Sequence, residues 1–139
     1  MNLFVYGTLT FPEIVQALTH NRYKARPAYI ENYLVTSLEA KPYPGMIEVP
    51  GATAEDWLLY DLEAPAIKIL DAWEGREYVK KRLSAITSRS ETETFAYVWR
   101  DVVHDYRPWD RDRFKRQYLD SYLLKRIPLF TAMTGTVVK

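Results

Sequence analysis

The opening of the chain constrains its fold most, because an apolar run stops at a glycine and then passes directly into a helical pattern. Residues 3–6 form a continuous apolar stretch of strand length, and Gly7 and Thr8 follow it. Apolar residues then recur at the i, i+3, i+4 and i+7 spacing of one helix face: Phe11, Ile14, Val15 and Leu18. The chain therefore opens with a strand, a tight glycine turn and a helix.

The start of this helix has a recognisable capping pattern. Thr10 and Glu13 have the spacing of the N-cap and N3 residues of a capping box. Pro12 would lie in the first turn, where a missing N–H costs nothing. We therefore expect the helix to be capped by the Thr10 side chain.

The rest of the chain mixes strand and helix patterns. Residues 64–75 predict a helix that Gly75 ends, and residues 110–126 predict a second helix before the apolar tail of residues 135–139. Aromatic and β-branched stretches predict strands, namely one or two in residues 28–38, one at 46–49, one at 57–62, and a hairpin formed by 82–88 and 94–100.

These elements indicate a single α+β domain spanning residues 1–139, most simply a curled sheet or barrel with two or three helices against it. Hydrophobic residues make up 47% of the chain and charged residues 27%, a balance typical of globular proteins. The formal net charge is only +1, with acids and bases interleaved, so we expect neither a nucleic-acid surface nor a membrane surface.

Several kinds of chemistry are excluded or disfavoured. The chain has no cysteine, which excludes disulfides, thiolate metal ligands and cysteine nucleophiles. His20 and His104 have no companion at ligand spacing and no GxSxG motif is present, so we expect no metal site and no serine-hydrolase elbow. No signal peptide or long apolar segment is apparent, and we expect a cytoplasmic protein.

The turn after the first strand is one candidate binding site. The first N–H groups of a helical turn have no partner within it and carry partial positive charge, so such a turn binds a carboxylate or phosphate without a basic side chain. Here the cradle would be Tyr6, Gly7, Thr8 and Leu9, with the Thr8 hydroxyl as an additional donor. A plain tight turn between strand and helix is the alternative interpretation.

Glu74 is the candidate proton-transfer residue. On the helix predicted over residues 64–75, it lies on the same stripe as the apolar Ile67 and Leu70. Its place at the helix C-terminus and beside apolar residues should raise its pKa towards the range of a general base. The alternatives are a solvated carboxylate in a frayed last turn, and Glu77 as the acid that acts instead.

Beyond these local patterns, the motifs occur in an order that is similar to a known family. "FVYGTL", "FPEIVQAL", "YPGM", "LDAWEGREYVKKRL" and "AYVW" follow one another, and an aromatic-rich terminal helix comes last. This arrangement resembles the γ-glutamyl cyclotransferase-like superfamily, in particular the branch of avirulence-induced-gene proteins and γ-glutamylamine cyclotransferases. The resemblance runs from Asn2 to about Tyr122.

The resemblance implies a small mixed β-barrel-like sheet with flanking helices and one central cavity. It implies that Tyr6, Gly7, Thr8 and Leu9 hold the glutamyl end of a small γ-glutamyl substrate, with the loop extending through two more residues, Thr10 and Phe11. It also implies that Glu74 transfers protons in an intramolecular acyl transfer that releases 5-oxoproline and needs no metal or cofactor.

Two positions depart from the pattern of many relatives. Trp57 stands where a glycine three residues before Tyr60 is usual, and Lys80 stands where an arginine two residues after Tyr78 is usual. Both departures bear on the substrate more than on the reaction. A non-catalytic protein that binds a carboxylate in the same cavity, and a transferase or hydrolase of another acyl compound, remain open alternatives.

Overall fold

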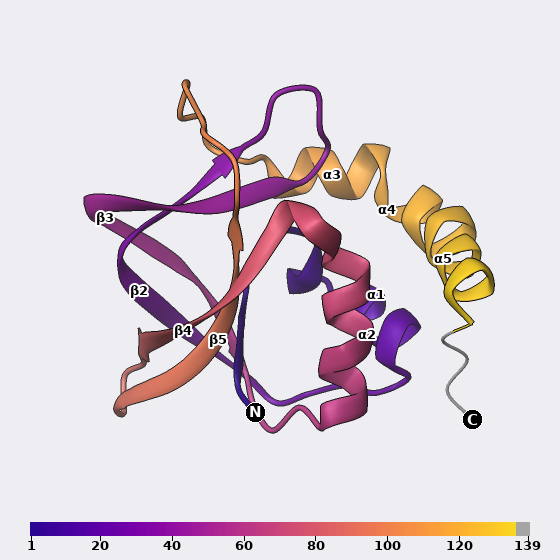
Figure 1. Cartoon of the computed structure of the whole chain (residues 1–139), viewed down its shortest axis with the longest axis horizontal. Helices are drawn as coiled ribbons and strands as arrows, with labels where there is room; N and C mark the ends of the chain where they lie inside the picture. The colour runs from indigo at the N-terminus through magenta and orange to yellow at the C-terminus, as the bar shows by residue number, and fades with distance from the viewer. Residues whose placement is uncertain (136–139) are drawn as a thin grey trace.

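The computed structural model describes residues 1–135, which form a closed five-stranded barrel with helices against it (Figure 1). The barrel order is β1-β3-β2-β4-β5, in which β1 pairs antiparallel with β3 and parallel with β5, while the other neighbours are antiparallel. The strands are β1 (Leu3–Val5), β2 (Ala25–Ser37), β3 (Pro44–Leu59), β4 (Tyr78–Ile86) and β5 (Glu91–Trp99). The expected α+β barrel is confirmed.

Strand β3 corrects the expectation of two separate short strands at residues 46–49 and 57–62. The pairing of β2 with β3 shifts between Glu31 and Tyr33, which pair with Thr53 and Glu48. Asn32 lies at this irregularity with a φ of 65°, and its side-chain oxygen accepts a hydrogen bond from the Gly51 N–H at 3.0 Å. The prolines and glycines of this segment therefore mark a bulge within one strand, not a break between two.

The helices cover one side of the barrel, where α1 and α2 lie against each other (Figure 1). The predicted helix over residues 64–75 is confirmed as α2 (Ala64–Glu74). The single helix predicted over residues 110–126 is wrong in one respect: α3 ends at Gln117, because Tyr118 has a φ of −128° and leaves the helical region. The helical segment that follows continues beyond residue 126, because one π-helical turn leads into α5 (Ile127–Thr134). Its apolar tail begins with Gly135, and residues 136–139 lie outside the described residues. The helical segments are η1 (Gly7–Thr10), α1 (Pro12–Thr19), α2 (Ala64–Glu74), η2 (Gly75–Glu77), α3 (Arg111–Gln117), α4 (Leu119–Ser121), η3 (Tyr122–Arg126) and α5 (Ile127–Thr134).

The expected capping box at the start of α1 is wrong. The N-cap residue of α1 is Phe11, which makes no side-chain capping bond. The turn after β1 is a 3₁₀ helix, so Thr10 ends that turn, and its hydroxyl donates to the Gly7 carbonyl at 2.6 Å. An extra helical turn therefore separates the strand from α1.

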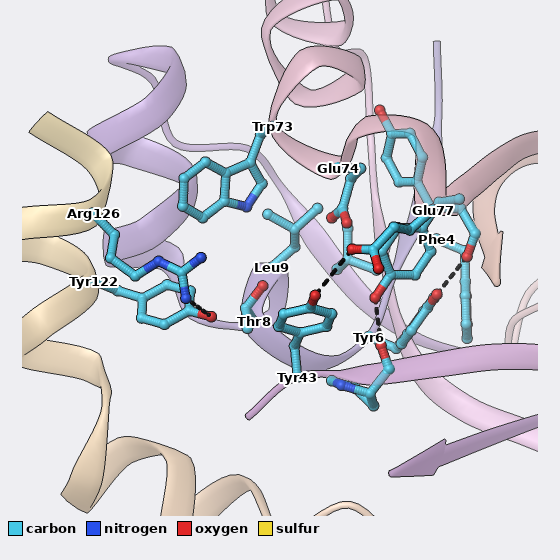
Figure 2. Close-up of a pocket in the computed structure, with 14 residues that line it drawn as sticks. Phe4, Tyr6, Thr8, Leu9, Tyr43, Trp73, Glu74, Glu77, Tyr122 and Arg126 are labelled. Atoms are coloured by element: carbon cyan, nitrogen blue, oxygen red, sulfur yellow. Dashed lines mark hydrogen bonds between the residues drawn. The ribbon is translucent and has the colours of Figure 1, made fainter. Parts of the chain in front are cut away.

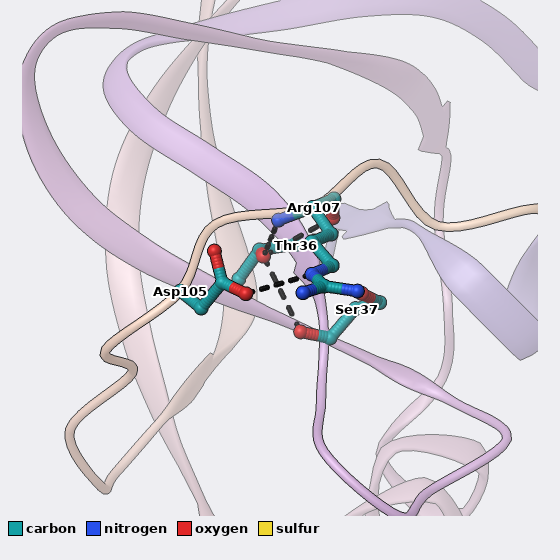
Figure 3. A network of polar contacts seen from close by, with 4 residues as sticks. All are labelled: Thr36, Ser37, Asp105 and Arg107. Atoms are coloured by element: carbon teal, nitrogen blue, oxygen red, sulfur yellow. Dashed lines mark hydrogen bonds and ion pairs between the residues drawn. The ribbon is translucent and has the colours of Figure 1, made fainter.

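A polar network fastens the connection between β5 and α3 to the end of β2 (Figure 3). Thr36 is fully buried, and its hydroxyl accepts a hydrogen bond from the Arg107 N–H at 3.0 Å. The Ser37 N–H in turn donates to the Arg107 carbonyl at 2.8 Å. Further along, the indole N–H of Trp109 donates to the Pro42 carbonyl at 2.9 Å. This connection thereby supports the segment that leads into β3.

Candidate active site

A cavity of about 150 Å³ lies where β1, the η1 turn, the end of α2 and the C-terminal helical segment meet (Figure 2). Its lining comes from segments distant in sequence: Phe4, Val5, Tyr6, Thr8, Leu9, Tyr43, Pro44, Trp73, Glu74, Glu77, Tyr78, Tyr97, Tyr122 and Arg126. The structure thus brings Glu74 and three of the six predicted loop residues to one cavity.

Glu74 is the last residue of α2, and its carboxylate points into the cavity (Figure 2). The helical stripe places it as the sequence predicts, because Ile67 and Leu70 on the same face are buried in the core. Within residues 1–135 the Glu74 carboxylate has neither a hydrogen-bond nor an ion-pair partner. Burial raises its pKa to about 8, because the surrounding protein solvates the charged form poorly.

Glu77 also lines the cavity, but its carboxylate already has partners within the protein. Its carboxylate accepts a hydrogen bond from the Tyr43 hydroxyl at 3.0 Å and forms an ion pair with Lys41 at 3.3 Å. It lies beyond Gly75, which ends α2. Of the two neighbouring acids, Glu74 is therefore the one whose oxygens remain available to a ligand.

The predicted loop is a sharp turn in which Gly7 is structurally required. Gly7 has a φ of +67°, and a Cβ atom placed there would lie 2.6 Å from the ring of Pro44. The Tyr6 hydroxyl is committed to the barrel, since it donates to the Tyr97 carbonyl and accepts from the Met46 N–H at 3.1 Å. Thr8 is buried and lines the cavity, and its hydroxyl has no partner within the described chain.

The last two residues of the predicted loop do not line this cavity. The Thr10 hydroxyl accepts from Arg111 Nε at 2.9 Å, and Thr10 lines a second hollow of about 530 Å³ on the other side of the turn. Phe11 is buried in the core, where its ring lies 5.5 Å from that of Phe114. Val5 and Leu9 line both cavities, so the turn separates them.

The two departures from the family pattern have distinct places. Trp57 lines the second hollow and not the cavity of Glu74, so it does not narrow that cavity. Lys80 does not line the cavity either. Its ammonium contacts Asp71 at 2.9 Å, and Asp71 also accepts a hydrogen bond from the Tyr97 hydroxyl at 2.7 Å. Lys80 therefore supports the wall of the cavity through Asp71.

The sequence patterns did not indicate that three tyrosines and an arginine line the cavity, namely Tyr78, Tyr97, Tyr122 and Arg126. Tyr78 and Tyr97 are held by hydrogen bonds to the Pro44 carbonyl and to Asp71, and burial raises the pKa of both phenols. Burial likewise raises the pKa of Tyr122 to about 12. The spacing of Tyr122 and Arg126, four residues apart on a predicted helix, was the signal that could have placed them on one face.

Among residues 1–135, no cluster of three or more His, Asp or Glu side chains could hold a metal ion. No helix of this part of the chain is long and apolar enough to cross a membrane.

The barrel, its flanking helices and the cavity of Glu74 define a fold that known proteins share. A solution structure of an Arabidopsis thaliana protein superimposes with a TM-score of 0.71 at 18% identity, covering 96% of this chain and 90% of that one. A structure of a γ-glutamyl cyclotransferase superimposes with a TM-score of 0.64 at 13% identity, covering 94% and 86% of the two chains. The fold class is thus that of the γ-glutamyl cyclotransferases.

Sequence comparison narrows the class to a family. The model of the family "Gamma-glutamyl cyclotransferase, AIG2-like" matches residues 3–118. The chain therefore belongs to this family. AIG2-like protein D of Arabidopsis thaliana is 24% identical over an alignment of 127 residues, and the match covers 88% of this chain and 84% of that relative.

Proposed function

We propose that this protein is a γ-glutamyl cyclotransferase, which converts a γ-glutamyl compound to 5-oxoproline and a free amine. The observation that carries the proposal is the Glu74 carboxylate, which faces the cavity without a partner in residues 1–135 and has a pKa of about 8. A group with this pKa accepts and returns protons near neutral pH. Membership in the family supports the same reaction.

In this mechanism the substrate carries its own nucleophile, the α-amine. Glu74 removes a proton from the ammonium group, and the amine nitrogen then attacks the γ-carbonyl carbon to close a five-membered ring. The tetrahedral intermediate collapses as the bond to the leaving nitrogen breaks, and Glu74 returns its proton to that nitrogen. The ring nitrogen still has one proton more than the lactam keeps, and it gives this proton to the regenerated Glu74 carboxylate, which passes it to the released amine. One C–N bond forms and one breaks, and the reaction needs no metal or cofactor.

The turn and the cavity walls supply orientation. The Thr8 hydroxyl and the N–H groups of the turn would hold the α-carboxylate or the γ-carbonyl oxygen, where N–H donors offset a developing negative charge. The cavity walls are fixed by the hydrogen bonds that the hydroxyls of Tyr6, Tyr78 and Tyr97 donate within the protein. Such walls would hold the flexible substrate in the bent geometry that ring closure needs.

The test is to incubate the purified protein with a panel of γ-glutamyl amines, amino acids and peptides, and to measure 5-oxoproline by mass spectrometry. We expect product from the wild type and from Glu77→Gln, and none from Glu74→Gln, with circular dichroism showing all three folded. Activity that persists in Glu74→Gln would refute this mechanism.

A different result would favour the non-catalytic alternative. If no compound gives 5-oxoproline, but the same compounds raise the thermal unfolding temperature of wild type and Glu74→Gln alike, the cavity binds a carboxylate without turnover. Release of the amine without 5-oxoproline would instead indicate hydrolysis or transfer of the acyl group.

A further inference from the structure

Arg126 lines the cavity from the side opposite Glu74 (Figure 2). Its guanidinium lies over the Tyr122 ring, 4.6 Å from the centroid, and Nη1 donates to the Tyr122 hydroxyl at 3.1 Å. Within residues 1–135 no acidic side chain forms an ion pair with Arg126. An arginine with five N–H donors therefore faces the cavity with most of them unused.

The guanidinium of Arg126 lies on a buried aromatic cluster. Tyr122 is buried, and its ring makes edge contacts with Trp73 at 6.0 Å and Phe114 at 4.9 Å. Tyr122 and Arg126 begin and end the π-helical turn η3, a kind of turn that is rare and often found at functional sites. A stacked guanidinium loses little further freedom when it binds a planar anion.

The depth of the lining groups indicates which part of a substrate Arg126 meets. Thr8 is buried, whereas the Arg126 side chain is exposed and so lies at the mouth of the cavity. The glutamyl part must reach Glu74 for ring closure, which leaves the departing amine directed towards the mouth. Lys41, the other cation near this mouth, is already paired with Glu77.

We propose that Arg126 is a carboxylate-binding specificity residue, and that the substrates are γ-glutamyl amino acids or peptides whose leaving amine carries a carboxylate near the scissile bond. This inference rests on the proposed function. A planar guanidinium suits a carboxylate because two parallel N–H···O bonds form at once. An uncharged γ-glutamyl amine offers Arg126 no such partner.

Tyr122 and Arg126 both lie beyond residue 118, where the match to the family model ends. The subsite is therefore assembled from the family's barrel on one side and from the C-terminal helical segment of this chain on the other. Differences in that segment would alter the preferred leaving group without altering the chemistry at Glu74.

The test uses γ-glutamylglycine and γ-glutamylglycinamide, which have the same size and differ in the terminal carboxylate. Their dissociation constants are measured by calorimetry with Glu74→Gln, in which turnover is blocked. We expect the acid to bind about ten-fold tighter than the amide, as for a charge-assisted hydrogen-bonded pair. Adding Arg126→Gln should remove this preference and leave the affinity for the amide unchanged.

Lys125→Gln in the same background is the matched control, since Lys125 is an adjacent exposed cation that does not line the cavity. The Lys125→Gln variant should still bind the acid more tightly than the amide. Equal affinities for acid and amide while Arg126 is present would overturn the proposal. So would an equal loss of both ligands on Arg126→Gln, because Arg126 would then hold the glutamyl end.

The binding measurement separates this proposal from the cyclotransferase reaction itself. If the wild type forms no 5-oxoproline while the Arg126-dependent preference persists, the reaction is refuted and the subsite stands. If the wild type is active and the preference is absent, the reaction stands and the subsite is refuted.

Discussion

At the scale of single residues, the carboxylate of Glu74 keeps its proton to an unusually high pH because protein replaces the water around it. A second acid has a similar environment. Burial raises the pKa of Asp56 to about 7, although the charge of Arg111 acts in the opposite direction. Two acids with raised pKa values make both activity and stability depend on pH, and the two dependences have opposite signs.

The activity should increase with pH. Glu74 must be deprotonated to act as the base, so kcat/KM for a γ-glutamyl substrate should fall about ten-fold for each pH unit below its pKa of about 8. A pH–rate profile measured in a series of buffers at constant ionic strength checks this. A profile that is flat between pH 6 and 8 would show that another group removes the proton.

The stability should decrease with pH over the same interval. The folded-state pKa of Glu74 lies above its unfolded value of 4.5, so the folded protein binds more protons between pH 4.5 and 8. The contribution of Glu74 to the free energy of unfolding is complete below pH 4.5 and is lost as the pH rises to about 8. Asp56 acts in the same direction, and its contribution is lost between pH 3.8 and about 7. Urea unfolding at pH 5 and pH 8 measures the loss.

Glu74→Gln provides the control for this measurement, since a neutral amide does not titrate. The variant should lose less free energy of unfolding between the two pH values than the wild type does. An unchanged difference would mean that Glu74 is solvated much as it is in the unfolded chain.

At the scale of elements, the η1 turn depends on close contact with the start of β3. Gly7→Ala should lower the free energy of unfolding by about 3 kcal/mol, because a left-handed backbone and a crowded Cβ atom each add a cost. Gly51→Ala is the matched variant: Gly51 has a φ of +86° but nothing within 4 Å of the added Cβ atom. It should cost only about 1 kcal/mol.

Urea denaturation of both variants gives the comparison. The additional decrease in the free energy of unfolding of Gly7→Ala over Gly51→Ala measures the cost of the contact between the added methyl group and the Pro44 ring. An equal decrease in the free energy of unfolding in the two variants would show that the η1 turn shifts to accommodate the methyl group at little cost. The cavity wall would then be more deformable than the packing indicates.

Local patterns predicted the elements well where one face alone was buried. The stripe of Ile14, Val15 and Leu18 placed α1, and the stripe of Ile67 and Leu70 placed both α2 and its terminal Glu74. The start of α1 was wrong because the capping pattern of Thr10 fits a helix that directly follows the strand, whereas a 3₁₀ turn comes between them.

The remaining parts of the cavity depend on contacts that no local pattern contains. Tyr6 meets the Tyr97 carbonyl across 91 residues, and Gly7 meets the ring of Pro44. Arg126 lines the same cavity as Glu74, and it follows Tyr122, whose ring packs on Trp73. Sequence spacing indicated the turn and Glu74, but the closure of the barrel decides which of these residues face one another.

At the scale of the whole molecule, the buried hydroxyl of Thr36 fastens the C-terminal third of the chain to β2 (Figure 3). Thr36→Val should cost about 1–3 kcal/mol, because the N–H of Arg107 loses its acceptor. The released connection should also be cut by trypsin several-fold faster at Arg100, the residue that follows β5. Mass spectrometry of a digestion time course measures this cleavage.

Thr36→Ser keeps the hydroxyl and should retain the wild-type cleavage rate. Asp105→Ala removes the exposed ion pair with Arg107 and should change stability by less than about 0.5 kcal/mol, since exposed pairs contribute little. Faster cleavage in Asp105→Ala than in Thr36→Val would assign the fastening to the surface pair instead.

Strand β1 closes the barrel by pairing Leu3 with Leu59 in β3 and with Phe95 in β5. During synthesis on the ribosome, β1 is therefore made before both of its partners, and it acquires the second one only after β5 has been translated. Until then its buried residues and the apolar face of α1 have incomplete cover, and such surfaces are open to chaperones and to aggregation. Of the five barrel strands, the first to be translated is thus one of the last to be fully paired.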